Sequence, residues 1–161
     1  MGRDVGNVST GNEGAAARTI GRIETEVAML MRLADRNRRT GDVLEHALER
    51  SAYLLLRRLT ENGPANVNAL AARLRLDPST VTRQVLAMES SGLVVRERDP
   101  EDGRGTLVAA TERGGEALAH TRTARAEVYA AVLAAWSETD RVSLADLLAR
   151  LNVDLDARSR R

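Results

Sequence analysis

The sequence contains no cysteine, which excludes disulfide bonds, thiolate zinc sites, cysteine catalysis and thiol redox sensing. Aromatic residues make up 2% of the chain and phenylalanine is absent, so Leu, Ala and Val must form the core. Such a composition favours helices. No apolar run approaches the roughly 20 residues that span a bilayer, and no secretory signal is visible. We therefore expect a cytoplasmic protein without a membrane partner.

Lysine is also absent, so all 24 basic residues are arginines, against 23 acidic residues. A formal net charge of +1 does not by itself predict a polyanionic partner. Any such binding depends on where individual arginines lie, because each guanidinium can grip a phosphate or a guanine edge in two places. The 161 residues and 43% apolar content fit one domain with an accessory helical part.

The spacing of apolar, glycine and proline residues predicts a mainly α (α+β) fold. Residues 1–17 are rich in Gly, Asn, Ser and Ala and are expected to form a disordered tail. Helices are then predicted over about 20–34, 43–60, 67–74, 78–91 and 112–135, with a last helix starting at Ser137, and strands over 93–98 and 106–110. The capping signals are Asn66, Asp77 followed by Pro78, Thr111, and Ser137 with Asp140.

Residues 61–111 combine two short helices, a tight turn and a two-stranded hairpin, the arrangement of a winged helix-turn-helix DNA-binding domain. On a helical wheel the fourth helix has an apolar side, consisting of Val81, Val85 and Met88. The opposite side carries Ser79, Arg83, Leu86 and Ser90, flanked by Thr82. Such a face can enter a major groove, although an ordinary solvated face fits equally well. Leu86 is the exception there, since it could touch a thymine methyl group or pack on the wing.

The hairpin tip, residues 99–105, holds one arginine, Arg104, among three acids. A thin loop with an arginine suits a minor groove, whereas the acids repel phosphates unless they are paired. We therefore expect Asp102 to bridge to an arginine and to stabilise the wing. The alternative is an ordinary charged turn.

Three motifs together resemble the MarR family of bacterial transcriptional regulators. They are Ser79-Thr80-Val81-Thr82-Arg83, the wing Asp99-Pro100-Glu101-Asp102-Gly103-Arg104, and Leu107 followed by Thr111-Glu112-Arg113-Gly114. The resemblance implies a homodimer whose first, fifth and sixth helices interlock. It also implies a repressor, less often an activator, that binds a palindromic operator in double-stranded DNA and is released by a small, often aromatic or phenolic, molecule.

By matching positions, the resemblance assigns Ser79, Thr80, Thr82 and Arg83 to the major groove and Arg104 to the minor groove. Further candidates for DNA contact are Asn66, Gln84, Arg96 and Arg98. One departure is Gly103, where the family often has a second arginine. The effector-binding residues are not readable from the sequence.

The apolar stripes of the first and last helices exceed what a domain of roughly 75 residues can cover, which favours a homodimer. We expect residues 18–60 and 112–161 to form a helical dimerisation region. Candidate interface residues are Ile23, Leu30, Trp136, Leu147 and Leu151. Trp136 could instead stack on a ligand, and Tyr53 could line an effector cavity or merely pack.

No catalytic or phosphate-binding motif is present, and His46 and His120 lie on separate predicted helices without partners at metal spacing. We therefore expect no enzyme activity, no cofactor and no metal. The leading hypothesis is a ligand-responsive DNA-binding repressor. The alternatives are a winged-helix module that binds protein instead of DNA and, less well supported because it leaves the wing unexplained, a small-molecule carrier.

Overall fold

The computed structural model describes residues 9–40, 47–100, 102–103 and 105–158, which fall into two compact units divided after Glu45. The first unit contains one long helix, α1 (Ser9–Thr40). Residues 9–17, expected to be disordered, are therefore helical, and residues 1–8 lie outside the described part. Disorder was predicted because residues 9–17 lack apolar periodicity, but such periodicity indicates only which helices are buried on one side. The alanines at 15–17 favour a helix without being buried.

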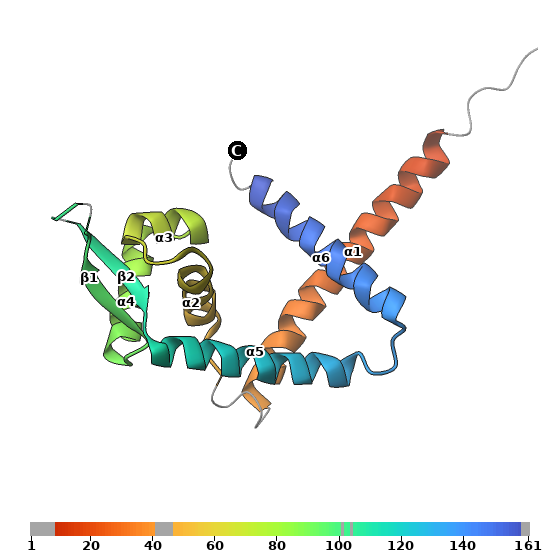
Figure 1. Cartoon of the computed structure of the whole chain (residues 1–161). Coiled ribbons are helices and arrows are strands. Elements are labelled where there is room, and N and C mark those ends of the chain that lie inside the picture. Colours follow the sequence, from red (N-terminus) through yellow and green to blue (C-terminus); the bar gives the residue numbers. More distant parts are fainter. Residues whose placement is uncertain (1–8, 41–46, 101, 104, 159–161) are drawn as a thin grey trace, which may run out of the picture. The chain divides into compact units, whose positions relative to one another are not determined.

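The second unit is mainly α with one small antiparallel sheet (Figure 1). Its elements are α2 (Arg50–Asn62), α3 (Val67–Leu74), α4 (Pro78–Ser90), β1 (Val94–Arg98), β2 (Thr106–Ala110), α5 (Glu112–Val132) and α6 (Glu138–Arg158). The two strands pair from Val94 opposite Ala110 to Arg98 opposite Thr106. The predicted fold class, a mainly α chain containing a winged helix-turn-helix, is confirmed.

The core lies among α2, α3, α4, the hairpin and the start of α5. Its fully buried apolar side chains are aliphatic, as the composition predicts: Leu55, Leu56, Leu70, Val81, Val85 and Val108. The leucines of α2 thus belong to the same core as the helix-turn-helix. Packing of this kind fixes the inner side of α4 and leaves its other side to face outward.

The start of α2 differs from the prediction, because the helix begins at Arg50 and not near residue 43. Two side chains of α5 bind the backbone just before it. The Leu48 amide donates to Thr121 Oγ1 (3.0 Å), and the Leu48 carbonyl accepts from the Arg125 guanidinium (3.1 Å). These tertiary bonds occupy groups that a longer helix would use. Residues 41–46 lie outside the described part.

The last two helices begin with the caps that the sequence predicts. Thr111 Oγ1 accepts from the amide of Gly114 (3.0 Å) at the start of α5. Before α6, Ser137 and Asp140 bond each other reciprocally, with Ser137 Oγ donating to Asp140 Oδ2 (2.6 Å) and accepting from its amide (3.1 Å). α5 ends at Val132, three residues earlier than predicted. Among the described helices, none has the length and apolar character needed to cross a membrane.

Candidate nucleic-acid interface

The turn between α3 and α4 is built from backbone hydrogen bonds. Asn66 caps α3, its side chain accepting from the Ala69 amide (2.8 Å). After α3, Arg75 adopts the left-handed conformation (φ 53°), which lets the chain reverse tightly. Pro78 then starts α4, and the Asp77 carbonyl accepts from Thr80 (3.0 Å) and Val81 (3.1 Å). Asp77 occupies the N-cap position as predicted, but its side chain makes no capping bond.

The two sides of α4 separate as the helical wheel predicts. Val81 and Val85 are fully buried and Met88 is nearly so. Ser79, Arg83, Leu86 and Ser90 are all exposed on the opposite side, and Thr82 is half-buried beside them. We call this exposed side, consisting of Ser79, Thr82, Arg83, Leu86 and Ser90, the outer face of α4. It lies open to solvent in the single chain.

Two of the three hydroxyl groups on the outer face donate hydrogen bonds to the backbone of α4. Thr82 Oγ1 donates to the Pro78 carbonyl and Ser90 Oγ donates to the Ala87 carbonyl, each at 2.8 Å. In the free chain both hydroxyl protons are therefore directed at the helix backbone. Within the described residues no ion pair holds the Arg83 guanidinium. Arg83 is therefore the strongest donor on this face.

Two further candidates are partly engaged with the protein itself. The Asn66 side-chain oxygen is used in capping α3, which leaves its amide group exposed. Gln84 is half-buried, and its Oε1 is buried without a hydrogen-bond partner among the described residues. The structure thus brings Ser79, Thr82 and Arg83 onto one face, with Gln84 between that face and the core.

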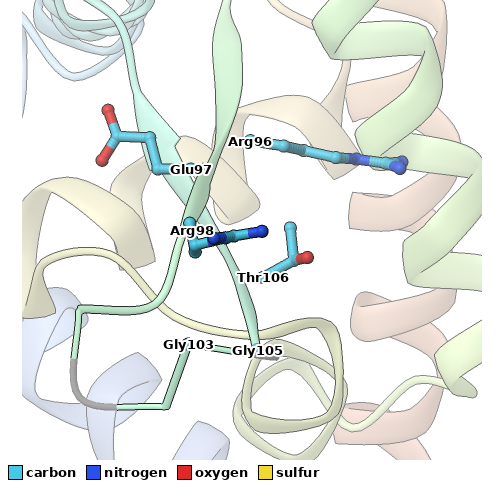
Figure 2. A pocket seen from close by; sticks show the side chains of 6 residues that line it. All are labelled: Arg96, Glu97, Arg98, Gly103, Gly105 and Thr106. Carbon is cyan, nitrogen blue, oxygen red and sulfur yellow. The ribbon is translucent and has the colours of Figure 1, made fainter.

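The first strand of the wing, β1, carries charged side chains on both of its faces. Arg96 and Arg98 lie on one face of β1 and Glu97 on the other, around an open hollow also lined by Gly103, Gly105 and Thr106 (Figure 2). Arg96 reaches back to α4, where its Nε lies 3.3 Å from the Glu89 carboxylate. This half-exposed ion pair ties the wing to the end of α4. Arg98 carries no ion pair within the described residues and remains the cation of this strand that faces solvent.

The wing tip is closed by hydrogen bonds that the backbone of Asp102 makes with its neighbours. Its amide donates to Asp99 Oδ1 (3.3 Å), and its carbonyl accepts from the Gly105 amide (2.7 Å). Gly105 also accepts from the Asp99 amide (3.0 Å), and a Cβ on Gly105 would lie 3.0 Å from that of Asp99. Arg104 lies outside the described residues, so its predicted minor-groove contact stays a prediction.

A close backbone approach fixes the hairpin against α5. Thr111 Oγ1 donates to the Gly92 carbonyl (2.7 Å), and a Cβ on Gly114 would lie 2.1 Å from the Leu93 carbonyl oxygen. From the sequence alone, Gly114 was recognised only as part of the Thr111-Glu112-Arg113-Gly114 motif. A glycine three residues after a Thr cap is the signal that would have revealed the contact. The sequence also did not reveal that Thr121 is buried on α5 and binds the Leu48 amide.

The predicted interface residues are largely exposed in the single chain. On α1, Ile23 and Leu30 are exposed. In the second unit Trp136 and Leu147 are exposed, Leu151 is half-buried, and α6 has no buried residue at all. Tyr53 is half-buried and stacks on the Arg125 guanidinium, 4.3 Å from the ring centre.

The described part of the chain offers no cluster of metal ligands. No group of three or more His, Asp or Glu side chains there could hold a metal ion. His120 is exposed on α5, and His46 lies outside the described residues.

Comparison with known proteins identifies the family. A sequence model of the MarR family matches residues 48–106. The HTH-type transcriptional regulator YxaD of Bacillus subtilis is 40% identical over 134 residues, covering 81% of this chain and 90% of that protein. The chain belongs to the MarR family. It is accordingly a DNA-binding transcriptional regulator and not an enzyme.

Solved structures of the MarR family share its fold. A MarR-family protein from Bacillus stearothermophilus matches with a TM-score of 0.73 at 24% identity, covering 87% of this chain and 97% of that one. The PcaV regulator of Streptomyces coelicolor, solved in complex with its natural ligand, matches with a TM-score of 0.55 at 22% identity, covering 94% and 96%. The arrangement of helices and wing is therefore that of the family.

Proposed function

We propose that this MarR-family chain is a homodimeric repressor that binds a palindromic operator and controls its own or a neighbouring operon. The observation that carries the proposal is the division of α4. Its inner side is locked into the core, while Ser79, Arg83 and Leu86 face solvent. A rigid helix with one open polar side, joined to a wing, is the element that reads a major groove.

Each contact has its own role in the proposal. Arg83 donates to the O6 and N7 atoms of a guanine, while Ser79, Thr80 and Thr82 lie along the same groove. Arg104, with Arg98 and Arg96 behind it, brings the wing to the neighbouring minor groove. Asn66 at the start of α3 and Gln84 between the outer face and the core make supporting contacts through their amide groups.

A second copy supplies the cover that the terminal helices lack. α6 is 21 residues long with no buried residue, yet Leu147, Leu148, Val153 and Leu155 are exposed along it. An apolar stripe of this extent is stabilised when another protein surface covers it. A twofold interface with a second copy would also cover Ile23, Leu30, Trp136 and Leu151. Of the predicted dimerisation region, residues 18–60 and 112–161, α1 and α6 would then form the interface, whereas α2 packs in the core of the helix-turn-helix. The two copies of α4 would lie about 34 Å apart, one turn of DNA.

Release by a small molecule of an aromatic or phenolic kind completes the proposed cycle. The support is the family itself, in which PcaV was solved with its natural ligand bound. A ligand dissociates the complex if it binds better to a dimer whose α4 spacing does not match the operator. Action on an operator places the protein in the cytoplasm with the chromosome.

The test is selection of binding sites from randomised double-stranded DNA by the full chain. We expect a palindromic consensus with half-sites about one helical turn apart, and affinity that falls steeply with salt because arginines displace counterions. Failure to enrich any sequence, with no retardation of genomic DNA at low salt, would contradict the proposal. That result would favour the alternative of a winged helix that binds a protein.

Asp102 provides a separate test of the wing. We infer that its carboxylate bridges to an arginine and so stabilises the wing. Asp102→Asn should therefore weaken operator binding several-fold although it removes a negative charge beside DNA. Glu97→Gln, on the other face of β1, is the matched control and should leave binding unchanged or slightly stronger. The measurement is a fluorescence anisotropy titration. Tighter binding by Asp102→Asn would show that the carboxylate acts only by repelling phosphates.

A further inference from the structure

Leu86 is a large apolar side chain at the centre of the outer face of α4. Half of its surface (50%) is exposed, and it is not among the partly buried residues that pack against the core. Three residues before it stands Arg83, and four residues after it stands Ser90, both exposed. Of the two roles that the sequence left open, contact with DNA or packing on the wing, this exposure favours contact with DNA.

Leu86 has few competitors for reading bases on this face. The hydroxyls of Thr82 and Ser90 donate hydrogen bonds to backbone carbonyls, and Gln84 is turned partly into the protein. Between Thr82 and Ser90 the exposed side chains are those of Arg83, Leu86 and Ala87, and Leu86 is the larger of the two apolar ones. In the major groove the apolar feature of a base edge is the 5-methyl group of thymine.

Building on the proposed repressor function, we propose that Leu86 reads a thymine methyl group and that this contact sets the base next to the guanine read by Arg83. Three helical residues span about 4.5 Å, and stacked base pairs are about 3.4 Å apart. The thymine and the guanine therefore lie one or two base pairs apart in each half-site. A twofold dimer repeats the pair in the opposite orientation.

The experiment removes the methyl group and leaves base pairing intact. In the site selected by the wild-type protein, each thymine is replaced in turn by deoxyuridine, and affinity is measured by anisotropy. We expect one thymine per half-site whose replacement weakens binding about three- to fivefold, as the loss of one buried methyl group implies. This thymine should lie within two base pairs of the guanine whose contact depends on Arg83.

Variants then assign the effect to a side chain. Leu86→Ala should bind the thymine and deoxyuridine sites equally. Leu54→Ala, which shortens a leucine of similar exposure (42%) on α2, should keep the full preference for thymine. Because Leu86 is half-exposed and outside the core, its variant is expected to fold, and a thermal unfolding curve checks this.

Two results would overturn the assignment while leaving the repressor function intact. One is selective binding with no thymine sensitive to the loss of its methyl group, and the other is a sensitivity that persists in Leu86→Ala. Absence of selective binding by the wild-type protein would instead overturn the proposed function, and the Leu86 assignment with it.

Discussion

Replacing Arg83 by alanine is expected to weaken operator binding by about 1–3 kcal/mol and to relax the base preference at one position of each half-site. The guanidinium is exposed on the outer face of α4, with no ion pair inside the described part of the chain to compete for it. Two parallel hydrogen bonds to guanine are lost with the side chain. Anisotropy titrations against the selected operator and against random DNA measure both effects.

The salt dependence separates a base contact from a phosphate contact. A phosphate-binding arginine reduces the slope of affinity against salt by about one when it is removed, whereas a base-reading arginine leaves the slope nearly unchanged. Arg122→Ala on α5 removes the same charge from another exposed position and should have little effect on binding. Equal weakening on operator and random DNA by Arg83→Ala would contradict major-groove reading.

Replacing Gly114 by alanine should destabilise the second unit by about 3 kcal/mol or more. The new Cβ would stand 2.1 Å from the Leu93 carbonyl oxygen, a backbone atom that cannot move without shifting the hairpin. The Thr111 bonds to Gly92 and Gly114 would be strained at the same time. Urea denaturation followed by circular dichroism measures the loss.

The neighbouring glycine is a natural control. A Cβ on Gly115 meets nothing within 4 Å, and this residue is also within α5. Gly115→Ala should therefore stabilise the protein by about 0.5–1 kcal/mol through helix propensity. Similar free energies of unfolding for the two variants would show that the Gly114 contact with Leu93 is not a constraint.

The sequence predicted best what depends on periodicity and on capping chemistry. The division of α4 between Val81, Val85 and Met88 on one side and Arg83 on the other followed from a wheel, because neighbouring elements bury one side of a helix. The Asn66, Thr111 and Ser137 caps followed from side chains that reach backbone amides two or three residues away. These are local relations, which a sequence records directly.

Relations between distant residues were not predictable in the same way. α2 begins at Arg50 and not near residue 43, because Thr121 and Arg125, over 70 residues later, bind the Leu48 backbone. The Glu89–Arg96 ion pair and the Gly114 approach to Leu93 likewise depend on how α4, the hairpin and α5 pack together. The direction of the Thr82 and Ser90 hydroxyl bonds on α4 is also a property of the folded helix.

Dimethyl sulfate footprinting of the operator tests the central claim most directly, since it reports the N7 atom of guanine in the major groove. The wild-type protein should protect one guanine in each half-site, the two lying about one helical turn apart, and Arg83→Ala should lose both protections. A footprint without symmetry, or protection that survives in Arg83→Ala, would show that the exposed side of this helix is not what two copies of the chain present to DNA.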